Sequence, residues 1–227
     1  ISVQYDYIIT LTMPTGLKVV TSMNGDVKTT VFEFDKVPDA NNYKILVDNQ
    51  EIGNFKLEEK DGKYFVDITQ YVNKVGDHSI RIGAINTDNP NIKDSKMSMI
   101  AHTTTEKLNA VVGDKDSFTA SISEDISSGS DKKSASIHAN WSGVQNGYEY
   151  LIELQINGGE KIQIGRTSIL KEGKVSYSFN LESVGIEYDS EIAQNGGYVV
   201  IVTALGHDYY TQSESTQTIC TFDSITG

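Results

Sequence analysis

Residues 34–53 read FDKVPDANNYKILVDNQEIG. The aromatic residue Phe34 closes one run, turn-forming residues follow at 38–42, and Tyr43 opens a run in which apolar and polar side chains alternate. Pro, Asp and Asn favour turns, and alternation with a period of two is typical of a strand with one buried face. The stretch therefore predicts two β-strands joined by a turn, with a second tight turn at Asp48 and Asn49.

The same alternation continues through residues 1–105. We expect a first strand over residues 7–12 and 17–20, interrupted by Pro14 and Gly16, and a last strand over residues 96–103. Between them, the side chains that we expect to point inward are Phe32 and Phe34, then Tyr43, Ile45 and Val47, then Tyr64, Val66 and Ile68, and finally His78, Ile80, Ile82 and Ala84. The pattern predicts a unit of β-strands that each bury one face.

The second half of the chain repeats this order. Trp141 takes the place of Phe34, and Tyr150 follows it by nine residues, as Tyr43 follows Phe34. Tyr198 precedes Ala204 by six residues, as His78 precedes Ala84. The inward sets are Ala135, Ile137, Ala139 and Trp141, then Tyr150, Ile152, Leu154 and Ile156, then Val175, Tyr177, Phe179 and Leu181, and finally every second residue from Tyr198 to Ala204. A repeat of this length predicts two tandem domains.

The repeated aromatic anchors and the Val-Pro turn resemble the fibronectin type III domain in its bacterial form. The resemblance implies an all-β chain of two tandem seven-stranded fibronectin type III-like sandwiches, over residues 1–105 and 106–227. Residues 104–116 are expected to be a linker and lead-in to the second. His78 and Tyr198 would occupy the tyrosine corner, where the polar tip of an aromatic ring bonds to nearby backbone. Burial there would keep His78 uncharged.

Composition excludes several classes of function. The 227 residues carry a net charge of −12, with 19 Lys and Arg against 31 Asp and Glu, so we expect no nucleic-acid partner. No apolar run approaches the ~20 residues that span a bilayer, so we expect no membrane insertion. Cys220 is the single cysteine, which excludes an internal disulfide. The chain begins at Ile1 without a basic-then-apolar leader, and we interpret it as a fragment or mature form.

No pattern indicates catalysis or a cofactor. The four histidines show no metal-ligand spacing, and no nucleophile or phosphate-binding motif occurs. The net charge divides into −3 for residues 1–105 and −9 for residues 106–227. Glu187, Asp189 and Glu191 alternate in one loop of the second half, where they indicate either a weak cation site or a solvated acidic surface. We expect a noncatalytic protein with no cofactor and no tightly bound metal.

Two features are candidates for binding. Tyr209 and Tyr210 follow a Gly-His-Asp turn, and such a pair either stacks on a sugar or protein partner or packs on the rim of the sandwich. Leu151, Val199 and Ile201 would point away from the core of the second domain and form an exposed apolar patch.

The sequence therefore predicts a spacer or adhesion module that positions other parts of a larger protein. The alternative is a carbohydrate-binding module that uses Tyr209 and Tyr210. The expected partners are other domains of the parent protein, an extracellular protein or a glycan. The resemblance implies that the protein is secreted or displayed on the cell surface.

Overall fold

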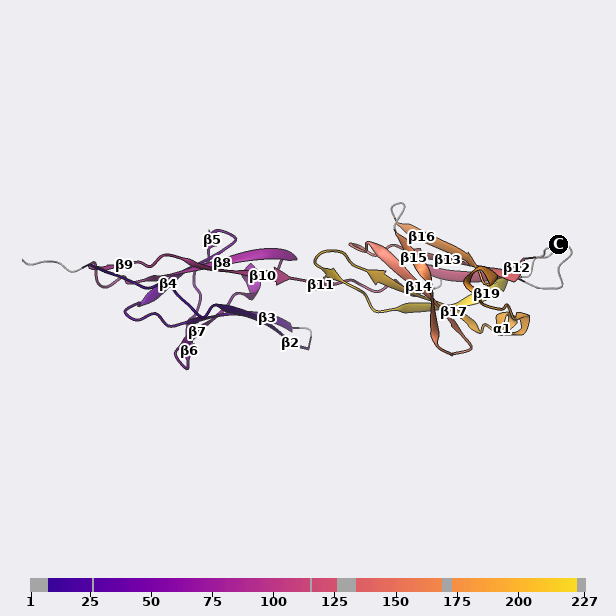
Figure 1. Cartoon of the computed structure of the whole chain (residues 1–227), viewed down its shortest axis with the longest axis horizontal. Helices are drawn as coiled ribbons and strands as arrows, with labels where there is room; N and C mark the ends of the chain where they lie inside the picture. The colour runs from indigo at the N-terminus through magenta and orange to yellow at the C-terminus, as the bar shows by residue number, and fades with distance from the viewer. Residues whose placement is uncertain (1–7, 26, 115, 126–133, 169–172, 224–227) are drawn as a thin grey trace, which may run out of the picture. The chain divides into compact units, whose positions relative to one another are not determined.

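The computed structural model describes residues 8–25, 27–114, 116–125, 134–168 and 173–223. The chain divides into two compact units, unit 1 over Ile1–Thr105 and unit 2 over Glu106–Gly227. Both are built from β-strands, and the short α-helix α1, Ser190–Gln194, belongs to unit 2 (Figure 1). The protein is all-β.

Unit 1 holds two four-stranded sheets that lie in separate layers (Figure 1). One sheet has the order β10-β8-β4-β5 and the other β2-β3-β7-β6. These strands are β2 (Lys18–Asn24), β3 (Val27–Asp35), β4 (Asn42–Val47), β5 (Gln50–Glu51), β6 (Glu58–Lys60), β7 (Lys63–Asp67), β8 (Gly76–Ile85) and β10 (Ser98–Thr104). Among the described residues, the two sheets contain eight strands rather than the expected seven, and β5 and β6 are short strands at their edges. A separate parallel pair joins β1 (Ile9–Thr10) to β9 (Ile92–Lys93).

One core fills the space between the two sheets of unit 1. Phe32, Phe34 and Val66 come from one sheet, and Tyr43, Ile45, Ile80 and Ile82 come from the other, all 3% exposed or less. The inward sets expected from period-two alternation are therefore confirmed, with Tyr64 half-buried against the core. Burial of such apolar side chains is the main force that holds two sheets together.

The main sheet of unit 2 is continuous and has seven strands, in the order β15-β14-β17-β19-β12-β13-β16. The strands are β12 (Phe118–Asp125), β13 (Ser134–Ser142), β14 (Glu149–Ile156), β15 (Lys161–Ser168), β16 (Lys174–Asn180), β17 (Tyr198–Leu205) and β19 (Thr216–Asp223). β12 pairs antiparallel with β13 and parallel with β19, so it joins the two halves of the sheet. Side chains from both halves enter one core, which means that the sheet folds back over itself.

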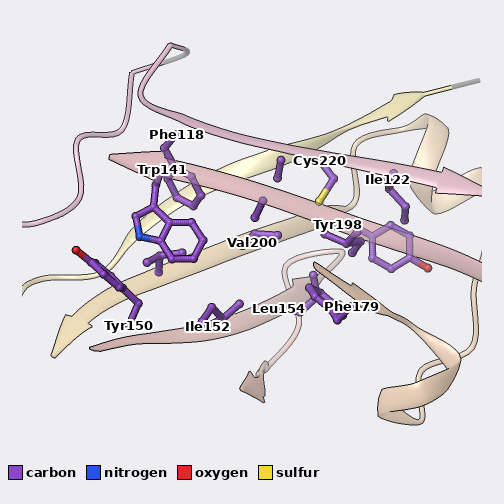
Figure 2. Close-up of a cluster of buried hydrophobic side chains, with 14 of the residues drawn as sticks. Phe118, Ile122, Trp141, Tyr150, Ile152, Leu154, Phe179, Tyr198, Val200 and Cys220 are labelled. Atoms are coloured by element: carbon purple, nitrogen blue, oxygen red, sulfur yellow. The ribbon is translucent and has the colours of Figure 1, made fainter. Parts of the chain in front are cut away.

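Trp141 lies at one end of that core and is 1% exposed. Figure 2 shows its indole ring between Phe118 and Tyr150, with edge-on ring contacts at centroid distances of 6.2 and 5.4 Å. The indole Nε1 is buried and has no hydrogen-bond partner among the described residues. The expected inward position of Trp141 is confirmed.

Residues 106–111 are part of unit 2 and not a loose linker. The strand β11 (Glu106–Lys107) pairs in parallel with β18 (Tyr210–Thr211), and Leu108 and Val111 enter the core at 5% and 2% exposure. The expected linker and lead-in over residues 104–116 thus includes a short strand and two core residues of unit 2. A partner strand about 100 residues downstream holds the segment, and local sequence patterns do not report such a contact.

Both units repeat the same side-chain-to-backbone hydrogen bonds. The backbone N–H of Val37 donates to the Tyr43 hydroxyl at 2.8 Å, and that of Val144 donates to the Tyr150 hydroxyl at 2.6 Å. Ser95 caps strand β8 by accepting from the backbone N–H of Ala84. In unit 2, Ser213 accepts from Ala204 in the same way. Buried backbone donors must be satisfied, so these contacts fix the turns of each unit.

His78 and Tyr198 occupy equivalent corners of the two units. The Tyr198 hydroxyl accepts from the backbone N–H of Asp189, and His78 Nε2 bonds to the Lys74 carbonyl at 2.8 Å. His78 Nδ1 also lies 2.7 Å from the Asp48 carboxylate. Because the Asp48 carboxylate and the Lys74 carbonyl both accept hydrogen bonds, this geometry favours the doubly protonated ring. The expectation of an uncharged His78 is wrong: burial lowers its pKa, but hydrogen bonds to Asp48 and Lys74 outweigh burial and the pKa is raised.

Candidate binding site

The predicted tyrosines lie in a tight connection between β17 and β18. A Cβ added at Gly206 would clash with the Tyr210 carbonyl oxygen, so the close return of the chain requires glycine there. Asp208 adopts a left-handed conformation with φ of 56°, and the Tyr210 N–H bonds to the His207 carbonyl. The loop is therefore closed by its own backbone, which fixes where both tyrosines emerge.

Tyr210 is half-buried and packs against the core of unit 2. Tyr210 pairs with Glu106, as Ile92 of unit 1 pairs with Ile9. Tyr210 lies three positions before the capping serine of unit 2, and Ile92 lies three positions before that of unit 1. This equivalence explains Tyr210 as a rim residue of the fold. Tyr209 is also half-buried, and its carbonyl accepts from the Glu106 N–H at 3.0 Å.

Tyr210 also lines a hollow of about 180 Å³ beside the β11–β18 pair. The other lining residues are mainly polar: Glu106, Lys107, Leu108, Asn109, Gln145 and Asn146. Three carboxamides and one aromatic ring offer hydrogen-bond donors, acceptors and an apolar face within one small surface. Lys107 forms an ion pair with Glu214 at the edge of the same segment.

The most exposed aromatic side chain at this end of unit 2 is Tyr148, which sequence reasoning missed. It is 61% exposed, and its ring lies 5.0 Å from that of His207. His207 Nδ1 in turn lies 2.8 Å from the Asp208 carboxylate. Tyr148 directly precedes β14 (Glu149–Ile156) and stands two residues before the inward Tyr150. Because the strand begins only at Glu149, Tyr148 lies outside its alternation.

The expected apolar patch on the outer face of unit 2 is only partly present. Ile201 points away from the core but is 1% exposed, while Leu151 and Val199 are half-buried. Ile201 sits on the central strand β17 between Glu153 of β14 and Gln217 of β19. Alternation predicts the direction of a side chain correctly here, but not that its neighbours cover it. Ile219, beside Val199, is the exposed apolar residue of this face, at 60%.

The acidic loop before β17 has a structural use. The Asp189 carboxylate accepts from the backbone N–H groups of Glu191 and Ile192 and so caps α1.

Among the residues that the structure describes, no group of three His, Cys, Asp or Glu side chains is placed to hold a metal ion. Within the same residues, no helix has the length and apolar character needed to cross a membrane.

Unit 1 carries a larger hollow, of about 450 Å³, which no sequence pattern predicted. It is lined by Thr29, Val31, Asn54, Phe55, Lys56, Glu58, Phe65, Asp67, Gln70 and Tyr71. One signal was present in the sequence: if Val66 points inward, the neighbouring Phe65 must place an aromatic ring on the outer face. The other walls come from two separate segments, and no local pattern brings these together.

Comparison with known proteins gives the chain no family. No family model matches it, and no curated protein matches it. Among solved structures, the crystal structure of domains A168–A170 from titin aligns with 95% of this chain at 11% identity and a TM-score of 0.35. The chain spans 62% of the length of that titin structure.

Proposed function

We propose that the protein is a noncatalytic spacer or adhesion module that positions other parts of a larger protein. One observation carries the proposal: among the residues that the structure describes, each unit has a hydrophobic core of its own, and the two cores share no residue. A module with its own core needs no neighbour in order to fold, and such modules are suited to tandem use.

The two units are further proposed to be fibronectin type III-like sandwiches. The support is the repeat of three hydrogen-bonded elements at equivalent places, namely the anchor tyrosines, the capping serines and the corner residues. A repeated set of buried backbone contacts fits the duplication of one fold. On this proposal the protein acts outside the cell or on its surface, and its partners are neighbouring domains or an extracellular protein.

Expression of residues 106–227 alone tests the modular character that this function requires. We expect a cooperative melt and an amide NMR spectrum that matches the signals of unit 2 in the whole chain. An unfolded isolated unit would count against the proposal, because a positioning module must hold its shape on its own.

The second candidate function is carbohydrate binding by unit 2. The favouring observation is the hollow of about 180 Å³ in which Tyr210 meets Asn109, Gln145 and Asn146. A glycan array tests it, with the double variant Tyr209→Ala and Tyr210→Ala as the comparison. Hits that disappear in the double variant, while its melting temperature holds, would favour recognition over spacing.

A further inference from the structure

The hollow of unit 1 lies on the outer side of the β2-β3-β7-β6 sheet, opposite the core. Its floor is formed by outward side chains of neighbouring strands, Val31 of β3 and Phe65 and Asp67 of β7, with Val31 and Asp67 directly paired. Residues 54–58 form one wall, and the 3-10 turn η1, Thr69–Tyr71, forms the other. At about 450 Å³, the hollow falls in the size range of small-molecule sites.

Three aromatic rings face this hollow from three different segments. Phe65 comes from the sheet, Phe55 from one wall and Tyr71 from the other, and all three are half-buried. No ring–ring contact joins any of them to another aromatic side chain among the described residues. Phe55 and Tyr71 also pack against the core of unit 1, and the surface that the three rings leave exposed in the hollow is available to an apolar ligand face.

The rim carries hydrogen-bonding groups with little net charge. Asn54 and Gln70 are exposed carboxamides, each with donors and an acceptor. Lys56 and Glu58 pair with each other at 3.0 Å, which leaves Asp67 as the remaining charge. Hydrogen bonds from Thr69 outweigh burial and lower the pKa of Asp67, so its carboxylate is ionised at neutral pH.

Hydrogen bonds hold the walls in place before any ligand arrives. Asp67 Oδ1 accepts from both the backbone N–H and the hydroxyl of Thr69, at 2.9 and 2.6 Å, which leaves Oδ2 for another donor. Thr69 Oγ1 accepts from the Thr30 backbone N–H at 2.8 Å and so ties η1 to β3. The Tyr71 hydroxyl donates to the Gly53 carbonyl at 3.2 Å, which ties the second wall to the first. A prearranged site loses less entropy when it binds.

We propose that this hollow of unit 1 is a binding site for a neutral oligosaccharide. A pyranose ring has an apolar C–H face and a rim of hydroxyl groups. The apolar face can stack on the rings of Phe65, Phe55 and Tyr71. Carboxamides and a carboxylate with a free oxygen pair with such hydroxyl groups by donating and accepting together. The remaining negative charge at Asp67 opposes an acidic sugar. The site is separate from the Tyr209 and Tyr210 loop, and it does not depend on the spacer function.

NMR titration of the whole chain tests the proposal, with neutral oligosaccharides of glucose, mannose, xylose and N-acetylglucosamine as probes. A polygalacturonic oligosaccharide serves as the acidic comparison. We expect at least one neutral probe to shift the amide signals of Phe65 and Gln70, with a Kd of about 1 mM or tighter. We expect the acidic probe to shift neither signal.

The variants Gln70→Ala and Phe65→Ala should each raise the Kd of the bound probe about tenfold, a change that the titration can measure. Gln70 is exposed, so its replacement leaves folding intact. Val20→Ala, on the outer face of the same sheet beside Val31, is the matched control and should bind as the parent does. Absence of any shift, binding that survives Phe65→Ala, or binding lost only in the Tyr209 and Tyr210 double variant would each overturn the proposal. Preference for apolar peptides over every sugar would overturn it as well.

Discussion

The His78 corner makes unit 1 more stable when the ring is charged, and the clearest perturbation is a change of pH. The buried imidazolium donates to Asp48 at 2.7 Å and to the Lys74 carbonyl at 2.8 Å. Loss of one proton leaves one of these acceptors facing a lone pair. Because the folded pKa of His78 is raised, its contribution is fully present below the unfolded value of about 6.5 and is lost as the pH rises through the folded pKa.

The size of this contribution follows from the exposure of the pair. Hydrogen bonds to charged groups contribute about 1.5–3 kcal/mol, and solvent screening reduces this where a partner is exposed. The His78 side chain is 6% exposed, while that of Asp48 is 49% exposed. We therefore expect about 1–2 kcal/mol for Asp48→Asn, measured by urea unfolding at pH 6, and a smaller cost at pH 9.

Three neighbouring groups bear on the same titration. Burial raises the Asp48 pKa, but hydrogen bonds from His78 and Ser79 outweigh it and lower the pKa overall, so the Asp48 contribution is lost only in acid. Asp77 further favours the charged His78. His102, directly across from His78 on β10, has its pKa lowered by burial and by the charge of His78, so it destabilises unit 1 as the pH falls below about 6.5.

Histidine NMR separates these effects, because each ring reports its own protonation. We expect His78 to titrate above the unfolded value of about 6.5, His102 below it, and His78 to shift downward in Asp48→Asn. A folded pKa of His78 below 6.5, or a value unmoved by Asp48→Asn, would refute the reasoning. Urea melts that show unit 1 gaining stability between pH 7 and pH 9 would refute it independently.

Three further predictions concern unit 2. Trp141→Ala should lower the free energy of unfolding by about 3–5 kcal/mol, whereas Trp141→Phe should cost clearly less, because it removes a buried donor that has no partner; an unchanged melt of the Ala variant would place Trp141 at the surface. Ser213→Ala should cost about 1–3 kcal/mol in chemical denaturation, because it leaves the buried Ala204 N–H unsatisfied; a cost near zero would mean that the cap is dispensable. Cys220 should resist alkylation at pH 8 in the native state and react on unfolding, because burial raises the pKa of its thiol to about 12; rapid native labelling would contradict its burial.

The strands could be predicted from the sequence because local patterns encode them. Period-two alternation identified the inward side chains around Phe34 and Trp141, and turn residues identified where strands end. Alternation could not predict that Ile201 is covered, because coverage depends on which longer side chains lie on the neighbouring strands. A binding role for Tyr209 and Tyr210 stays a prediction, because their half-buried positions fit packing on the rim of the fold as well as they fit ligand binding.

Other features needed contacts between distant segments. The charge of His78 depends on Asp48, 30 residues earlier, and on the turn that carries the Lys74 carbonyl. The lead-in at Leu108 is ordered by Thr211, whose carbonyl accepts from the Leu108 N–H. The hollow of unit 1 joins β3, β7, η1 and residues 54–58. Sequence patterns indicate local conformation only, and all three arrangements depend on contacts between segments that are far apart in the chain.

Mechanical unfolding of single molecules of the whole chain tests the central claim most directly. Two units of 105 and 122 residues should unfold in two separate events, which release roughly 360 and 410 Å at roughly 3.4 Å per residue, less the folded length of each unit. Trp141→Ala should lower the rupture force of the larger event alone. A single event, or gradual extension without resistance, would contradict a protein that acts by holding its neighbours in position.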